Sequence, residues 1–240
     1  MSHEDRFVTT DDGERIAITH YTAGHPHVII VCHGFFQRRR TRLFRALAQR
    51  LTPHSDVVSM DFRGHGQSSG RYTFSARETL DVLAVLHDVR PRYQRVCGLG
   101  FSLGTVSVLD AAVRERTMDR LVLVSPPMAF EEIENHWWAP RSLITTLRKG
   151  SWGWTWRLGS LRLPKPRPLE LIARVAPTPV LLIHGTHDPI VTARHSVALY
   201  AAAAEPKRCA MIPRGLHAEA LFADDPDGFV RLVSAWCFAE

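Results

Sequence analysis

One serine between two glycines is the clearest chemical feature of this sequence. Ser102 lies in the segment GLGFSLGT, residues 98–105, directly after an apolar run. A serine hydroxyl is a poor nucleophile at neutral pH unless a base takes its proton and an acid orients that base. The chain supplies both later, Asp188 in the segment HGTHDPIV and His217 in the segment GLHAEAL. Serine, acid and histidine in this chain order are the residue types needed for acyl transfer.

The elements that must position these residues are short apolar runs. Eight of them recur, at residues 7–10, 15–21, 27–33, 56–61, 95–101, 120–125, 179–184 and 209–213. The first two alternate and are joined by a polar turn, which predicts an antiparallel hairpin. The later runs are apolar throughout and are separated by helical patterns, which predicts parallel strands with helical crossovers. The expected fold class is α/β, with a mostly parallel eight-stranded central sheet flanked by helices.

The helical patterns between the runs have the 3.6-residue period of amphipathic helices. They cover residues 41–51, 75–89, 102–116, 196–204 and 228–238. Ser75 and Glu78 have the spacing of a capping box, which predicts a helix start at Ser75.

Ser102 falls on a turn between a strand and a helix. Gly100 and Gly104 are expected there because the turn brings backbone segments too close together for side chains. Asp188 and His217 each follow a strand of the same parallel sheet, so all three side chains are expected at one edge of that sheet.

Two backbone amides are expected to stabilise the negative charge of acyl transfer. The amide of Leu103 lies at the helix start, where free N–H groups gather. The amide of Phe35 follows Gly34, which lets the chain turn so that this amide faces the pocket. His33 is interpreted as a structural residue that orients this turn.

Five segments together resemble the α/β-hydrolase family, specifically its small serine hydrolases with an inserted cap: HGF, DFRGHGQSSG, GFSLG, HGTHDPIV and GLHAEAL. The resemblance covers nearly the whole chain except residues 127–170. It implies the α/β-hydrolase fold and a nucleophile, acid and base at Ser102, Asp188 and His217. A serine at the nucleophile position implies an acyl-enzyme. The resemblance also implies a structural loop near the site, with Asp61, Arg63, His65 and Gly66.

The segment 127–170 breaks the strand and helix rhythm and divides the chain into a core, 1–126 and 171–240, and an inserted cap. Five of the six tryptophans lie there, and residues 136–168 hold seven basic residues and no acidic one. We expect two or so short helices in this Trp-rich basic cap. Its aromatic area suits an acyl chain or an aromatic substrate, although the tryptophans alternatively serve only to hold the cap on the core. The candidate substrate-binding residues are Phe36, Phe101, Trp137, Trp138 and Trp152.

Three consecutive arginines, residues 38–40, follow the turn at Gly34. We expect Arg38, Arg39 or Arg40, with cap residues such as Arg148 and Lys149, to attract an anionic acyl substrate, such as a lysophospholipid, an acyl-CoA or an acyl carrier. A solvated basic face is the alternative, in keeping with the net charge of +6.

The sequence thus predicts a carboxylic ester hydrolase that acts on a small acyl ester or thioester. A thioesterase or lysophospholipase and a catalytically silent binding protein on the same fold remain alternatives. Each site residue also has another interpretation: Ser102 as a helix cap, Asp188 as a turn residue, and His184, His187 or His195 as the base.

No cofactor, metal or nucleic acid is expected, since the histidine pairs lack partners at metal-binding spacing and no nucleic-acid motif is present. The four cysteines are widely spaced and are expected to be reduced. Neither an export signal nor an apolar run of about 20 residues is found, so a cytoplasmic protein with weak attraction to anionic surfaces is expected.

Overall fold

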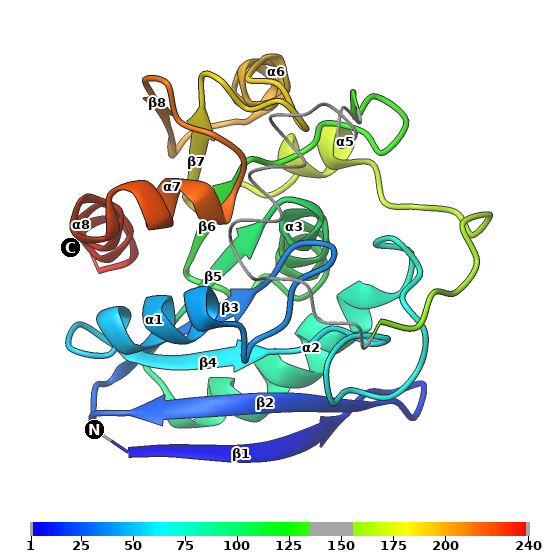
Figure 1. Cartoon of the computed structure of the whole chain (residues 1–240), viewed down its shortest axis with the longest axis vertical. Helices are drawn as coiled ribbons and strands as arrows, with labels where there is room; N and C mark the ends of the chain where they lie inside the picture. The colour runs from blue at the N-terminus through cyan, green and yellow to red at the C-terminus, as the bar shows by residue number, and fades with distance from the viewer. Residues whose placement is uncertain (1, 135–155, 239–240) are drawn as a thin grey trace.

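A central eight-stranded sheet organises the computed structural model, which describes residues 2–134 and 156–238 (Figure 1). Its strand order is β1-β2-β4-β3-β5-β6-β7-β8. β1 and β2 form the antiparallel hairpin, β2 pairs antiparallel with β4, and all other pairs are parallel. The predicted fold class is therefore confirmed. The strands are β1 Ser2–Thr9, β2 Arg15–Thr22, β3 His27–Cys32, β4 Asp56–Met60, β5 Arg95–Phe101, β6 Arg120–Val124, β7 Val180–Gly185 and β8 Lys207–Ile212.

Helices cover both faces of this sheet, and each face has its own apolar core. One core joins the sheet to α2 (Glu78–Val89), α3 (Leu103–Glu115), α5 (Pro168–Ile172) and α6 (Arg194–Ala202). The other joins it to α1 (Arg42–Leu51), α7 (Glu219–Asp224) and α8 (Pro226–Cys237). The central strands are buried on both sides, which explains why their sequences are apolar without alternation. Among the described helices, none is long and apolar enough to cross a bilayer.

The predicted capping box at Ser75 and Glu78 is wrong. Helix α2 begins at Glu78, and the Glu78 carboxylate accepts hydrogen bonds from the backbone N–H of Thr73 at 2.6 Å and from its hydroxyl at 3.0 Å. Phe74 and Ser75 have positive φ angles of 56° and 72°. This bend brings Glu78 to the turn before the helix, while the Ser75 hydroxyl donates to the carbonyl of Leu103 at 3.3 Å.

Two of the four cysteines are paired, contrary to expectation. Cys97, near the start of β5, and Cys237, the last residue of α8, form a disulfide with a Cα–Cα distance of 5.9 Å. Their separation of 140 residues gives no local sequence signal for this contact. Cys32 and Cys209 are free thiols.

The described flanks of segment 127–170 are bonded to each other and to the core. Leu169 donates to the carbonyl of Met128 at 3.2 Å, and Tyr72 donates to the carbonyl of Arg157 at 2.8 Å. Helix α5 begins inside this segment, and its Leu171 and Ile172 pack in the core. The boundaries of the cap stay a prediction, because its expected helices and Trp137, Trp138 and Trp152 lie outside the described residues.

Candidate active site

Ser102 occupies a strained turn between β5 and α3. Its backbone has φ 50° and ψ −124°, a region that non-glycine residues seldom adopt, and its amide donates to the carbonyl of Val124 at 2.9 Å. Its side chain forms no capping bond with α3. The alternative interpretation as a helix cap is therefore not supported, and the hydroxyl is available to other partners.

The two flanking glycines are required by close backbone contacts. A Cβ atom on Gly100 would lie 2.7 Å from the Cα of Thr105. On Gly104 it would lie 2.8 Å from the carbonyl oxygen of Cys32, and it would overlap the carbonyl oxygen of His33 as well. Since these obstacles are backbone atoms, no side-chain rotation relieves them. The glycines let the start of α3 pack directly against the turn that follows β3.

His217 lies between Ser102 and Asp188. Its Nδ1 is 2.7 Å from Oδ2 of Asp188, and its Nε2 is 2.9 Å from Oγ of Ser102. When Nδ1–H donates to the carboxylate, Nε2 is left as an acceptor for the serine hydroxyl. The structure therefore brings together the three residues that the sequence singled out, across 115 positions of chain between serine and histidine.

Asp188 divides its two carboxylate oxygens between two tasks. Oδ1 accepts hydrogen bonds from the backbone N–H of Ile190 at 2.9 Å and of Val191 at 3.0 Å, while Oδ2 faces His217. Burial alone would raise the pKa of Asp188, but the attraction of His217 and the contact with His184 hold it well below its usual value. The residue is thus both a turn residue and the ionised partner of His217.

The three competing histidines each have another partner. His184 is buried, donating from Nε2 to the carbonyl of Val191 at 2.7 Å and accepting at Nδ1 from Ser196 at 2.6 Å. His187 is exposed, and its Nδ1 lies 3.1 Å from the hydroxyl of Thr186. His195 is buried and lies 3.0 Å from Glu134. Of these four histidines, all of them in the described part of the chain, only His217 contacts the hydroxyl of Ser102.

Two contacts that sequence reasoning missed hold the loop of His217. The hydroxyl of Ser125, which follows β6, accepts a hydrogen bond from the backbone N–H of Ala218 at 2.9 Å. The amide of Gln37 donates to Oε1 of Glu219 at 2.9 Å, which joins this loop to the turn after β3. Ser125 has a positive φ of 49°. The only sequence signal for its contact with Ala218 is that it lies at the end of a predicted strand.

The turn after β3 lies directly against the serine. A Cβ on Gly34 would be 3.2 Å from the Cβ of Ser102. His33 fixes this turn: its Nδ1–H donates to the carbonyl of Gly34 at 2.7 Å, and its Nε2 accepts from the amide of Phe62 at 3.1 Å. Burial lowers the pKa of His33 to about 4, so the ring is neutral at neutral pH.

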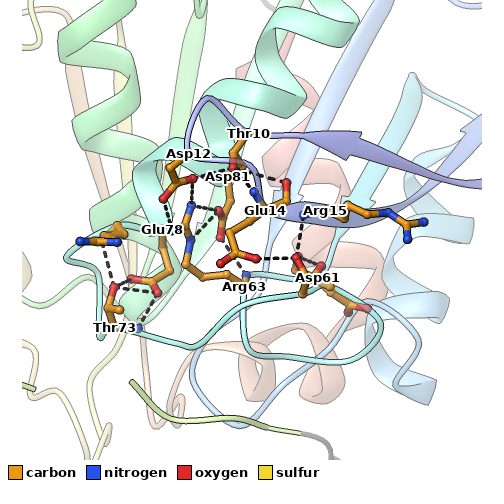
Figure 2. Close-up of polar contacts among 12 residues, drawn as sticks. Thr10, Asp12, Glu14, Arg15, Asp61, Arg63, Thr73, Glu78 and Asp81 are labelled. Atoms are coloured by element: carbon orange, nitrogen blue, oxygen red, sulfur yellow. Dashed lines mark hydrogen bonds and ion pairs between the residues drawn. The ribbon is translucent and has the colours of Figure 1, made fainter. Parts of the chain in front are cut away.

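A buried polar network shapes the loop after β4. The side chain of Arg63 lies between Asp12 and Asp81 (Figure 2). Its Nη1 donates to Oδ2 of Asp12 at 2.7 Å, and its Nε donates to Oδ1 of Asp81 at 2.8 Å. The neighbouring residues of the loop are also engaged in internal contacts. His65 packs its ring edgewise on Tyr72 at 4.5 Å between centroids, and Gly66 has a positive φ of 48°. The loop that the resemblance implied is therefore held by ion pairs of Arg63 with Asp12, in the turn between β1 and β2, and with Asp81 of α2.

Of the three arginines at 38–40, Arg39 is not available to an anionic substrate. Arg39 is 2% exposed and forms ion pairs with Asp61 and Asp5. Arg40 pairs with Asp5 at 2.6 Å. The Arg39–Asp61 pair is buried, whereas the Arg40–Asp5 pair is exposed and therefore weak, so attraction of an anionic substrate by Arg38 or Arg40 stays a prediction. Arg148 and Lys149 lie outside the described residues.

The candidate aromatic residues separate into two groups. Phe36 is 37% exposed, with its ring 3.8 Å from that of Phe35 and 5.1 Å from that of Trp156. Phe101 is fully buried, 5.2 Å from the ring of Phe44 in the core beneath the sheet. The prediction that Phe101 contacts the substrate is wrong, because its side chain is fully buried in the core that joins the sheet to α1, α7 and α8.

Comparison with known protein families identifies the family of this chain. The model of the alpha/beta hydrolase family matches residues 29–232 of this chain. The chain belongs to the alpha/beta hydrolase family. A similar protein of Mycobacterium tuberculosis, the uncharacterized protein Rv2307c, is 33% identical to this alpha/beta hydrolase over 219 residues, which cover 87% of this chain and 70% of Rv2307c.

Solved structures share the fold of this alpha/beta hydrolase over nearly its whole length. The esterase Pf2001 of Pyrococcus furiosus superposes with a TM-score of 0.80 at 20% identity, covering 98% of this chain and 90% of Pf2001. A hydrolase of Pseudomonas aeruginosa gives 0.78 at 22% identity, covering 98% and 99%. At these identities the likeness establishes the fold. Within the described ranges, no group of three or more histidine, cysteine or acidic side chains is arranged to hold a metal ion.

Proposed function

We propose that this chain is a serine hydrolase that cleaves carboxylic esters through an acyl-enzyme. The observation that carries the proposal is the continuous contact from Asp188 through His217 to the hydroxyl of Ser102, at 2.7 and 2.9 Å. The strained backbone of Ser102 supports it, since such strain is retained where the fold holds a reactive side chain in place.

In this mechanism Oγ of Ser102 attacks the ester carbonyl carbon as its proton passes to Nε2 of His217. The carbonyl oxygen becomes an oxyanion, and we assign the amides of Phe35 and Leu103 as its donors. Leu103 is the first residue of α3, so its N–H has no partner within the helix. The assignment of Phe35 is supported by Gly34, the residue before it, which lies against Ser102. Asp188 stays ionised and stabilises the imidazolium.

The tetrahedral intermediate collapses when the bond to the leaving alcohol breaks and His217 gives the alcohol its proton. Water then attacks the acyl-enzyme, with His217 taking the proton of that water and returning it to Ser102. In each half of the cycle His217 gives up the proton that it took, first to the leaving alcohol and then to Ser102, so the enzyme ends in its starting protonation state. No cofactor is needed for this sequence of steps.

Labelling with a fluorophosphonate probe tests the proposal, because the probe reacts only with an activated serine. The wild type and the variant Ser107→Ala should label, whereas Ser102→Ala should not. Ser107 is a matched control: it lies on α3, it is buried, and its hydroxyl has no hydrogen-bond partner. Labelling of Ser102→Ala at the wild-type rate would refute the assignment. No labelling of the folded wild type would favour a silent binding protein.

Turnover of substrates with different acyl groups and different leaving groups is then measured. We expect p-nitrophenyl esters of short to medium linear acids to be turned over, with Ser102→Ala inactive. Acyl-CoA thioesters offered at the same acyl length separate an esterase from a thioesterase. A higher kcat/KM for the thioesters would replace the ester assignment while leaving the nucleophile unchanged.

A further inference from the structure

The carboxylate of Asp188 contacts two histidines. Its Oδ2 lies 2.7 Å from Nδ1 of His217 and 3.4 Å from Nε2 of His184. The side chains of Asp188 and His184 are fully buried, whereas that of His217 is 13% exposed. The proposed mechanism uses His217 alone. His184 is thus a polar group, buried against the acid, that the mechanism leaves unused.

The partners of His184 fix which ring nitrogen carries the proton. Nε2 faces two acceptors, the carbonyl oxygen of Val191 at 2.7 Å and the carboxylate of Asp188. Asp188 is ionised, because its pKa is held well below the usual value, so neither acceptor has a proton to give. The proton is therefore on Nε2 of His184. Nδ1 accepts from the hydroxyl of Ser196 at 2.6 Å, which fixes the orientation of the ring.

Val191 is held on both sides, by Asp188 and by His184. Its amide donates to Oδ1 of Asp188 at 3.0 Å, and its carbonyl accepts from Nε2 of His184 at 2.7 Å. His184 belongs to β7, so these bonds tie the loop after the strand back to the strand itself. Val191 is fully buried, so a carbonyl that lost its donor there would have no access to solvent. The position of the Val191 amide thus depends on His184.

The Val191 amide in turn sets the orientation of the Asp188 carboxylate. The terminal torsion of an aspartate is broad, so its oxygens lie where their partners hold them. Oδ1 is held by the amides of Ile190 and Val191 at 2.9 and 3.0 Å, and Oδ2 is thereby directed at His217. If Val191 were displaced, the carboxylate would rotate and its contact with His217 would lengthen. Misplacement by about 1 Å can lower a rate by about 10²-fold.

We propose that His184 is a positioning residue, which holds the Asp188 carboxylate in the orientation that His217 needs. His184 acts through Val191 and Asp188, and it takes no proton during the reaction because both of its ring nitrogens are engaged. This rests on the proposed ester hydrolysis at Ser102. It gives His184 a place behind the acid, in contrast to its alternative interpretation as the base.

The test separates the N–H donor of His184 from the space that its ring fills. His184→Met fills a similar volume without a donor. His184→Gln keeps an N–H donor at about the distance of Nε2 from the backbone. His195→Met is the matched control, since His195 is also a fully buried histidine. Its partners are the amide of Met128 at 3.1 Å and the carboxylate of Glu134 at 3.0 Å, both on the chain after β6.

Turnover of a p-nitrophenyl ester gives the first readout. In His184→Met we expect kcat to fall by about tenfold to hundredfold, within the effect of a misplacement of about 1 Å. KM should be nearly unchanged, because no substrate contact is removed. His184→Gln should keep kcat within about threefold of the wild type, because the donor remains. His195→Met should keep the wild-type kcat, although both methionine variants should unfold at a lower urea concentration.

The proton on Nδ1 of His217 gives a second readout, which a loss of core packing alone does not move. A proton in a short hydrogen bond between an imidazole and a carboxylate resonates far downfield in a proton NMR spectrum, and Asp188→Ala identifies this resonance by removing it. The resonance should move upfield or broaden in His184→Met. It should be unchanged in His184→Gln and in His195→Met.

Three results would overturn the proposal. One is a folded His184→Met enzyme with the wild-type kcat and an unmoved His217 resonance. Another is an equal loss of kcat in His195→Met, which would show that a buried histidine in this region serves the fold alone. The third is a His184→Gln enzyme as slow as His184→Met, because the N–H donor would then not matter.

Ser196→Ala keeps the proposal open to refutation if His184→Met does not fold. It removes the 2.6 Å partner that orients the ring of His184, so kcat should fall by about threefold or more and the His217 resonance should broaden. No change in either would refute the role of His184. Failure of the proposed function is a separate outcome. It is shown by absence of fluorophosphonate labelling at Ser102, while the His217 resonance still reports the contact with Asp188.

Discussion

Asp188→Asn tests the distinct tasks of the two oxygens of one carboxylate. The asparagine oxygen can still accept the hydrogen bonds from the amides of Ile190 and Val191, now at 2.9 and 3.0 Å, so the loop keeps its shape. The NH₂ group then faces Nδ1 of His217 in place of Oδ2. Since an NH₂ group donates, Nδ1 must accept, and the ring proton moves to Nε2.

This change removes the acceptor that Ser102 needs. With the proton on Nε2, the imidazole cannot take the serine proton at 2.9 Å. In serine proteases the wrong tautomer lowers kcat by about 10⁴-fold, which corresponds to about 5.5 kcal/mol of transition-state stabilisation. We expect a loss of the same order here. Stability should fall by only about 1–3 kcal/mol, the range for one hydrogen bond to a charged group.

The assay is turnover of a p-nitrophenyl ester, with urea unfolding of the same samples. Asp188→Ala is the companion variant, because it removes both acceptor roles and should lose more stability than Asp188→Asn. A folded Asp188→Asn enzyme with less than a tenfold loss of kcat would refute the assignment of Asp188 as the residue that orients His217.

Three further changes have defined outcomes. Ser125→Ala removes the 2.9 Å acceptor of the Ala218 amide, so kcat should fall by about tenfold with little change in KM; an unchanged kcat in ester assays would show that this contact does not position the histidine loop. Burial lowers the pKa of His33 from its usual 6.5 to about 4, so between these pH values the unfolded chain binds more protons than the folded one. The contribution of His33 to stability is therefore complete above about pH 6.5 and falls as the pH is lowered. About 3 kcal/mol of it is lost by about pH 4. In His33→Gln that part of the pH dependence of urea unfolding should disappear, and an identical profile would contradict the inference. Gly104→Ala should destabilise the protein by about 3 kcal/mol or more in thermal unfolding, although alanine has a higher helix propensity than glycine, because the added Cβ lies 2.8 Å from the carbonyl oxygen of Cys32. A stabilised variant would refute this close contact.

The fold could be predicted from sequence because its signals are local. The apolar runs that became β3 to β7 are buried on both faces, and a buried parallel strand needs no alternation of polar residues. The order of Ser102, Asp188 and His217 along the chain pointed to the candidate site, since these residues lie after β5, β7 and β8 of the same sheet. Local pattern and overall architecture agree at those positions.

The errors arose where contacts join distant parts of the chain. Arg39 is one of three arginines in a row, and only the folded chain brings Asp61 and Asp5 to it. The disulfide between Cys97 and Cys237 is equally non-local. Ser75 has the right spacing for a capping box, but a left-handed bend that the sequence does not reveal gives Glu78 another partner.

The hydrogen bond from Gln37 to Glu219 has a mechanical consequence. It ties the strand connection that holds the proposed oxyanion donor Phe35 to the one that carries the proposed base. A bulky acyl group that pushed the first outward would pull the second with it, and the imidazole would lose its alignment with the serine. With the roles proposed for Ser102, His217 and the Phe35 amide, this one hydrogen bond would link the shape of the substrate to proton transfer, and a poorly fitting acyl group would react more slowly.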